Sequence, residues 1–199
     1  LENEYGLECI LELEFETHYQ RFLMPTVRGS DVGSKKRYAG VVEKEGQQEL
    51  VFKGLENVRT DWTKLARRFQ SELYRRVFFH EPYRDFVKSI SLQLRAGEVD
   101  DELVFRKRLR RRLDDYERNI PPHVQAARLA VVRGLEKPRR GDWVEYVMTT
   151  SGAEPLQSVQ AGLDYDLYAE RQLAPVADGI LHFLGTSFRE ITEAQFSLF

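Results

Sequence analysis

The side chains best suited to chemistry in this chain are cations, and one short run concentrates them. Residues 104–112 read VFRKRLRRR and hold six lysines and arginines in nine positions. The candidate anion-binding residues of this run are Arg106, Lys107, Arg108, Arg110, Arg111 and Arg112. Such side chains hold phosphate oxygens without reading a base sequence. A solvated helix face is the alternative, but the density of charge favours a local anionic partner.

Acidic and sulfur side chains offer little further chemistry. Glu12, Glu14 and Glu16 share one face of an alternating segment, and such an acidic face is more typical of solvent exposure than of a metal site. Cys9 alternates with apolar residues, so we expect it to be buried rather than nucleophilic. A single cysteine excludes an internal disulfide and favours a reducing compartment. We expect no metal site and no cofactor in this chain.

Composition limits the class of protein further. The chain has 199 residues and a net charge of −2, so it is not a general polycation. No apolar run approaches the roughly 18 residues that a membrane span needs. The first 16 residues carry six glutamates and no cation, unlike a secretory signal. We therefore expect a cytoplasmic protein, and the opening Leu1 suggests a part of a longer chain.

Residues 1–60 show the two-residue period of β-strands. Alternating apolar residues predict a half-buried strand over residues 7–16, which residues 17–24 could extend. A loop follows at residues 25–34, where two glycines, two serines and a proline gather. Two further apolar runs, RYAGVVE and QELVFKG, flank Glu45 and Gly46 and predict a hairpin.

Residues 61–199 show mostly the 3.6-residue period of helices. Thr60 or Asp61 is the expected N-cap of a helix that runs to about Phe79. The other expected elements are helices at 83–96, from Asp100 into the basic run, at 121–132 and at 164–184 with a kink at Pro175, and a strand at 143–150. On a helix, Lys107, Arg110 and Arg111 would share one face, with Arg108 and Arg112 to another side. The fold class is thus α+β, with a boundary near Asp61.

Several segments together resemble one family. KKRYAG at 35–40 resembles the Lys-Lys-x-Tyr motif of family B DNA polymerases, and KGLE at 53–56 and RTDW at 59–62 follow at the spacing where that family's palm meets its thumb. LVFRKRLRRRLDDYERNIPPHVQAARLA at 103–130 is similar to the family's thumb, as are WVEYVMTTSGAEPL and LDYDLYAERQLAPVADGIL. The combination is most similar to bacterial members of the polymerase II type.

The resemblance implies a C-terminal fragment that holds duplex DNA. Residues 1–60 would be the end of the palm and 61–199 the thumb, with Arg59 and Asp61 bracing the junction by an ion pair and Trp62 anchoring the first thumb helix. The minor-groove side of a primer–template duplex presents acceptors that all correct base pairs share. The DNA-binding residues implied are Lys35, Lys36, Arg37, Tyr38 and Arg59, the six cations of the basic run, and, as weaker candidates, His123 and Arg128.

The resemblance also implies what the chain lacks. The family's catalytic carboxylates hold two Mg²⁺ ions in an Asp-Phe-x-Ser-Leu-Tyr-Pro type segment and an Asp-Thr-Asp segment, and neither occurs in this sequence. We expect DNA-directed DNA polymerase activity, serving replication or repair near the nucleoid, from the full-length protein only. The fragment alone should be inactive.

The end of the sequence, QFSLF, resembles the peptide with which bacterial polymerases bind the sliding clamp. Gln195, Phe196, Leu198 and Phe199 would be the binding residues, as an extended peptide in an apolar groove. A frayed or core-packed terminus is the alternative.

Two other functions stay open on the sequence alone. The basic run could bind an acidic protein partner, in which case the chain would be a non-catalytic interaction module. An RNA-binding domain is less favoured, because the hairpin offers few aromatic residues for base stacking. Strands of an isolated palm remnant would lack their usual partners, so a non-native dimer is a further expectation.

Overall fold

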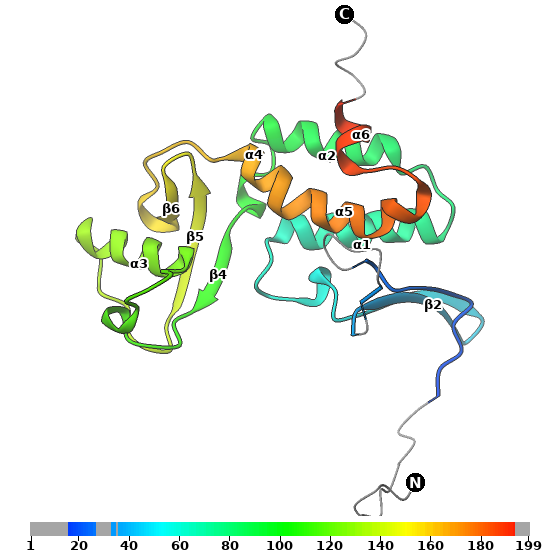
Figure 1. The fold of residues 1–199 in the computed structure, drawn as a ribbon, viewed down its shortest axis with the longest axis horizontal. Coiled ribbons are helices and arrows are strands. Elements are labelled where there is room, and N and C mark those ends of the chain that lie inside the picture. Colours follow the sequence, from blue (N-terminus) through cyan, green and yellow to red (C-terminus); the bar gives the residue numbers. More distant parts are fainter. Residues whose placement is uncertain (1–15, 27–32, 35, 194–199) are drawn as a thin grey trace, which may run out of the picture.

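The computed structural model describes residues 16–26, 33–34 and 36–193, which form a larger body with a smaller lobe beside it (Figure 1). Two hydrophobic cores define these parts, and Phe105 and Met148 pack against both. The small lobe comprises residues 105–161, and the main body comprises the other described residues. The small lobe is therefore an insertion within the sequence of the main body.

The first sheet of the main body is antiparallel, in the order β1-β2-β3. Its strands are β1 (Arg21–Leu23), β2 (Tyr38–Lys44) and β3 (Gln47–Lys53). Glu45 and Gly46 form the turn with φ of 51° and 77°, the left-handed pair that a two-residue hairpin requires. The expected hairpin is thus confirmed. The strand expected at 7–16 lies outside the described residues except for Glu16, which is not in a strand.

Helix α1 (Lys64–Phe78) carries the apolar stripe that its sequence predicts. Leu65, Phe69 and Leu73 are at most 1% exposed and pack in the same core as strand β2. The N-cap is Thr63, whose hydroxyl accepts from the backbone N–H of Ala66 at 3.2 Å. The expected cap at Thr60 or Asp61 is wrong, because the carboxylate of Asp61 is already held by Arg59.

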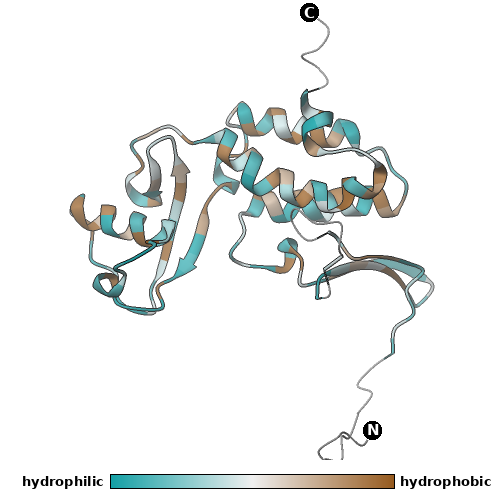
Figure 2. Cartoon of the chain, viewed as in Figure 1, coloured by the Kyte–Doolittle hydropathy of each residue, from teal (hydrophilic) through white to brown (hydrophobic). Residues whose placement is uncertain are grey.

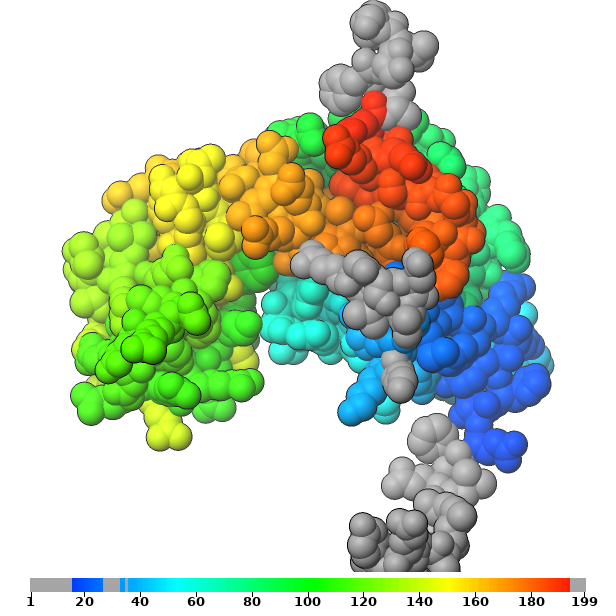
Figure 3. All heavy atoms as spheres, in the orientation of Figure 1, coloured from blue at the N-terminus to red at the C-terminus, as the bar shows by residue number. Residues whose placement is uncertain are grey.

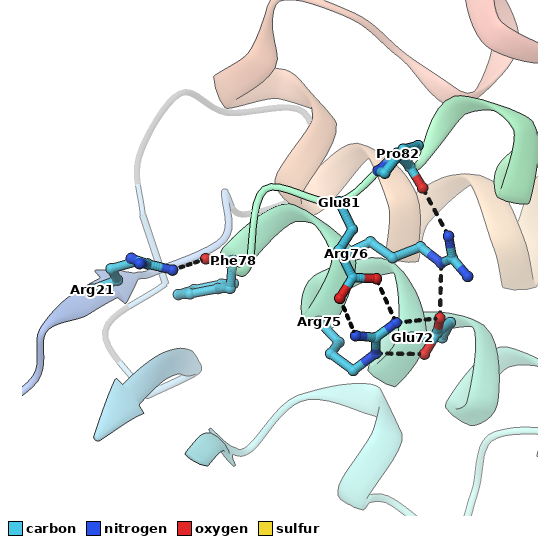
Figure 4. Close-up of polar contacts among 7 residues, drawn as sticks. All are labelled: Arg21, Glu72, Arg75, Arg76, Phe78, Glu81 and Pro82. Carbon is cyan, nitrogen blue, oxygen red and sulfur yellow. Dashed lines mark hydrogen bonds and ion pairs between the residues drawn. The ribbon is translucent and has the colours of Figure 1, made fainter. Parts of the chain in front are cut away.

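Arginines fix the end of α1 and the turn that follows it (Figure 4). The guanidinium of Arg75 lies between the carboxylates of Glu72 and Glu81, with Nη2 donating to both at 2.9 and 2.7 Å. Arg76 donates to Glu72 and to the carbonyl of Pro82, and Arg21 reaches from β1 to the carbonyl at the end of the helix. The chain then enters α2 (Arg84–Arg95), as expected.

The long helix expected at 164–184 is a series of shorter segments. They are α4 (Tyr165–Tyr168), a π-helical turn (Ala169–Leu173), α5 (Ala174–Leu181) and a 3₁₀ turn (His182–Leu184). The sequence predicts a kink at Pro175. The structure has a π turn just before this proline, whose nitrogen cannot donate a backbone hydrogen bond. Helix α6 (Phe188–Glu193) completes the main body.

The small lobe is built on a second antiparallel sheet, in the order β4-β5-β6. Its strands are β4 (Phe105–Arg108), β5 (Trp143–Thr149) and β6 (Gly152–Pro155). Helix α3 (Pro122–Val132) packs on one face, with Val124 and Ala127 against Val144 and Tyr146. The strand expected at 143–150 and the helix opened by the double proline are thus confirmed. Further 3₁₀ turns occupy Glu56–Val58, Asp100–Glu102, Leu113–Asp115 and Leu156–Ser158.

The helix expected from Asp100 into the basic run is wrong. A 3₁₀ turn is followed by strand β4, because Phe105 pairs with Tyr146 and their rings stack at 5.2 Å. The helical faces expected for the arginines therefore do not exist. Hydrophilic residues instead follow the extended chain through β4 and beyond it (Figure 2).

One tyrosine joins the two parts of the molecule. The hydroxyl of Tyr168 donates to the carbonyl of Leu103 and accepts from the N–H of Met148, each at 2.8 Å. The N–H of Asp164 donates to the carbonyl of Met148 at 3.1 Å. The chain thus enters and leaves the small lobe at neighbouring points.

The fold class α+β is confirmed by the two sheets and the helices around them. The core of the main body combines Ala39 and Val41 of β2 with Leu65 and Phe69 of α1. Packing is therefore continuous across residue 61, where the sequence predicts a boundary between domains.

Candidate nucleic-acid interface

A groove separates the small lobe from the main body. Figure 3 shows this hollow between the green surface of the lobe and the cyan surface of the main body. It encloses about 690 Å³. We call it the basic groove, and it is lined by Thr60 and Asp61 of the main body and by Arg106, Lys107, Arg108, Arg110, Arg111, Tyr116, Pro121, His123 and Trp143 of the lobe.

Strand pairing orients the first cations of the groove. Arg106 pairs with Glu145, and Arg108 pairs with Trp143, so these four side chains share one face of the sheet. The Arg106 guanidinium lies 4.6 Å from the centre of the Trp143 ring. Its Nε is 3.6 Å from the Glu145 carboxylate, a pair exposed enough to be weak.

The loop after β4 is held by its backbone and its leucines. Leu109 and Leu113 are buried at 1% and 4% exposure. The Tyr116 hydroxyl accepts from the backbone N–H groups of Arg110 and Arg111 at 3.2 and 3.3 Å. Both arginine side chains are exposed. A rigid backbone thus presents two guanidinium groups to the groove.

Lys107 lies on the other face of β4 and influences two titratable groups. Burial, with a smaller contribution from Lys107, lowers the pKa of His123, which favours the neutral imidazole. His123 is only 8% exposed and meets the Tyr116 ring edge-on. His123 thus forms part of the groove wall, whereas Lys107 supplies positive charge there.

Asp61 brings a carboxylate to the main-body side of the groove. Arg59 donates to both of its oxygens at 3.0 and 2.8 Å, so the expected ion pair is confirmed. Hydrogen bonding by Arg59 lowers the pKa of Asp61, and the charge of Lys107 adds to the effect. Burial raises the pKa of Tyr146 to about 12, with a contribution from Asp61. Asp61 of the main body therefore interacts electrostatically with Lys107 and Tyr146 of the lobe.

Arg112 lies apart from the rest of the run. It lines a second groove with Lys137, Arg139 and Arg140, and the groove encloses about 380 Å³. Asp114 accepts from Lys137 at 2.8 Å, and this ion pair lowers the pKa of Asp114. The sequence reasoning missed these three cations, although PRR at 138–140 is a visible basic cluster.

Arg128 forms hydrogen bonds within the lobe. Its Nη2 donates to the carbonyls of Leu113 and Tyr116 at 3.1 and 2.7 Å. It therefore holds the loop that carries the basic run.

The cations of the KKRYAG segment also differ in what they contact. Lys35 lies outside the described residues, and Lys36 is exposed in a turn. Arg37 pairs with Glu56, which is only 6% exposed and also accepts from Gln70 at 2.8 Å. Arg37 thus neutralises a buried carboxylate.

Tyr38 joins a cluster of aromatic rings. Its ring lies 5.9 Å from that of Tyr19 and 5.2 Å from that of Phe22. The ring is partly exposed at the start of β2. The Tyr38 ring therefore lies on the main body, apart from the residues that line the basic groove.

A further groove lies where the first sheet meets α5. Arg37 and Arg59 line it, and so does Arg171 of the π turn, a cation that the sequence reasoning did not select. Trp62 borders the same groove and packs against the main core, as expected. The predicted clamp-binding residues 195–199 lie outside the described residues.

The described residues contain no group of three or more histidine, cysteine, aspartate or glutamate side chains placed to hold a metal ion. Within the same residues, no helix is long and apolar enough to cross a membrane.

Comparison with known proteins assigns the class. Residues 3–182 match the model of DNA polymerase family B, so the chain belongs to this family, as its motifs indicate. It is 54% identical over 97% of its length to DNA polymerase II of Escherichia coli (strain K12), of which it covers 25%. It is 30% identical over 93% of its length to a DNA polymerase of Thermococcus hydrothermalis, of which it covers 11%.

The fold agrees with that assignment. The chain resembles the solved structure of the family B DNA polymerase from the hyperthermophilic archaeon Pyrobaculum calidifontis, with a TM-score of 0.58 and 28% identity. The match covers 77% of this chain and 21% of that one. The chain thus spans a quarter or less of the length of these relatives and of the solved structure.

Proposed function

We propose that this chain is the palm-end and thumb part of a bacterial DNA polymerase and that it holds the primer–template duplex. The observation that carries the proposal is the basic groove, where five cations of one run line a single hollow. They are Arg106, Lys107, Arg108, Arg110 and Arg111. Cations on a rigid backbone fix the position of phosphates without discriminating between sequences.

The main body adds a second contact in this proposal. Residues 1–60 act as the end of the palm, with Lys36 and Tyr38 on the minor-groove side of the duplex and residues 61–199 acting as the thumb. Arg59 and Asp61 then brace the junction between them through their double hydrogen bond. The main body and the lobe would thus contact the same duplex.

Chemistry belongs to the full-length protein in this proposal. The relatives are named as DNA polymerases, and each is much longer than this chain. Mg²⁺ supplies stabilisation of the attacking and leaving oxygens in nucleotidyl transfer. Its ligands would lie in parts of the polymerase beyond this chain, so the chain alone should bind DNA without extending a primer, and the whole protein would act in bacterial replication or repair at the nucleoid.

Fluorescence anisotropy of a labelled primer–template duplex across a salt series tests the grip. If about five phosphates are neutralised, log affinity should fall with log salt at a slope near −4.5. A variant with Arg106, Lys107, Arg110 and Arg111 changed to alanine should bind weakly, with a slope near −1. The matched control removes four cations of α2 and α6 instead, namely Arg84, Lys88, Arg95 and Arg189.

The control variant should keep the steep slope. Equal losses in both variants would show that only overall charge matters and would overturn the assignment of the groove. An acidic protein that competes as well as duplex DNA would favour an interaction module instead.

The clamp-binding tail is a separate part of the proposal and rests on the resemblance of QFSLF. Deleting residues 195–199 should abolish binding to a bacterial sliding clamp, with an affinity on the order of micromolar before deletion. Duplex affinity should not change. Clamp binding that survives the deletion would contradict this role for Gln195, Phe196, Leu198 and Phe199.

A further inference from the structure

Trp143 is a large aromatic side chain left exposed in a groove of cations. It remains 49% exposed although it begins strand β5 of a packed lobe. It lines the basic groove together with Arg106 and Arg108. Phosphate binding explains the cations there, but an indole offers a phosphate only one N–H donor.

The neighbouring side chains fix this indole in place. The Arg106 guanidinium lies 4.6 Å from the ring centre, at cation–π distance. Arg108 is the direct strand partner of Trp143, and its Nε donates to the carbonyl of Gly141 at 2.6 Å. The preceding turn is closed by Asp142, which accepts from the N–H of Arg139 at 2.7 Å. The ring thus lies against Arg106 at the end of a hydrogen-bonded turn.

The exposed part of the ring suits one kind of ligand. Aromatic side chains stack on nucleobases, and each stacked base contributes about 1–3 kcal/mol. Bases inside a duplex already stack on their neighbours, so they present edges rather than faces to a protein. Only an unpaired nucleotide can place a base face on Trp143 and its phosphate beside Arg106 or Arg108.

We propose that Trp143, with Arg106 and Arg108, forms a binding site for one unpaired nucleotide of a DNA strand. The site rests on the proposed function, since it lies in the groove that we assign to duplex phosphates. It extends that function, because it gives the lobe a preference for DNA that carries an unpaired base next to the held duplex.

Tryptophan fluorescence provides the test, since the chain has two tryptophans. In the Trp62→Phe variant, Trp143 is the single tryptophan and is excited selectively over the tyrosines, and a thermal melt checks that this variant remains folded. The probes are a fully paired blunt duplex made of two complementary strands, the same duplex with one unpaired thymidine, and oligothymidylate. We expect stacking to quench Trp143 with the two probes that carry unpaired bases and to leave its emission nearly unchanged with the fully paired duplex.

Affinity measurements complete the test. Trp143→Ala should reduce the ratio of bulged-duplex to fully paired-duplex affinity about tenfold, whereas Trp143→Phe should retain most of it because a ring remains. Leu156→Ala removes another exposed apolar side chain of the lobe and should leave the ratio unchanged. Equal quenching by all three probes, or an unchanged ratio in Trp143→Ala, would overturn the site.

The two proposals fail in distinguishable ways. Tight binding of the fully paired duplex without any preference for unpaired bases would remove the nucleotide site and leave the duplex grip standing. Absence of binding to every probe at low salt would overturn both.

Discussion

Arginines of the small lobe fall into two groups by what their guanidinium groups contact. Arg128 donates to two backbone carbonyls, and Arg133 donates to the carboxylate of Glu154 at 2.7 Å. Arg110 and Arg111 instead hold their place through backbone N–H groups, and their side chains remain exposed. The first pair stabilises the lobe, and the second pair is free to bind DNA phosphates, as we propose.

Glu154 is the most enclosed carboxylate of the lobe interior. It is 3% exposed and accepts from Arg133 and from the backbone N–H of Gln160 at 2.8 Å. The Arg133 hydrogen bond, aided by those backbone groups, lowers the pKa of Glu154. The pKa of Glu154 is lower in the folded state than in the unfolded state, where it is about 4.3. The ionised carboxylate therefore stabilises the lobe at pH values above about 4.3.

We expect Glu154→Gln to lower the free energy of unfolding by about 3 kcal/mol at pH 7, because the charge of Arg133 loses its buried partner. The loss should shrink as pH falls below about 4 toward the lowered pKa of Glu154, where the wild-type carboxylate is protonated as well. Urea unfolding of both proteins across this pH range measures the effect. Glu145→Gln, an exposed partner of Arg106, is the control and should cost less than about 1 kcal/mol.

At the scale of elements, two glycines mark the ends of strand β3. Gly46 and Gly54 both adopt positive φ, at 77° and 65°. A methyl group at Gly46 would meet nothing within 4 Å, whereas one at Gly54 would lie 2.6 Å from the carbonyl oxygen of Lys36. Gly54 therefore sets how closely the end of β3 approaches the KKRYAG segment.

We expect Gly46→Ala to lower the free energy of unfolding by about 1 kcal/mol, the cost of a left-handed alanine. Gly54→Ala should lower it by about 3 kcal/mol, because a backbone overlap is added to the same conformational cost. Urea unfolding of the two variants side by side isolates the overlap. Equal losses would mean that the Lys36 turn can move away freely.

Periodicity explains which elements could be predicted from the sequence. Helices α1 and α2 have apolar stripes, and α3 begins at Pro122 and is followed by Gly134, so local sequence determines all three. Strand β4 has four residues, three of them cations, and its pairing depends on Phe105 meeting Tyr146 about forty residues away. No local pattern carries that information.

The candidate site, too, could be predicted only in part from the sequence. Composition predicted that the basic run binds an anion, but only tertiary contacts show that Arg112 lies in a second groove and that Arg37 neutralises Glu56. The sequence predicts the strand that holds Trp143, but no local pattern shows that this ring is exposed. Its exposure arises at the start of β5, where Arg108 is its strand partner and Arg106 lies over the ring.

At the scale of the whole molecule, strand β3 forms an edge of the first sheet. An open edge presents backbone groups that pair with a second chain. We expect the isolated chain to form dimers in proportion to its concentration. Size-exclusion chromatography with light scattering measures this, and a monomer at every concentration would rule it out.

A charged substitution on β3 tests whether the edge of this strand forms the dimer. Val51→Lys places a cation on β3 and should shift the population toward monomer. Leu156→Lys adds the same charge to the small lobe and should leave the dimer in place. A dimer unaffected by Val51→Lys would have to use another surface.

The joint at Tyr168 has a consequence for how such a molecule can change over time. Its hydroxyl holds Leu103 on the way into the lobe and Met148 within it, and Asp164 on the way out bonds Met148 as well. The two ends of the inserted module adjoin, and Phe105 and Met148 pack against both cores. Evolution, or a protein engineer, could therefore lengthen, shorten or exchange the rest of the lobe as a cassette, provided that these two contacts are kept, while the main body is inherited intact.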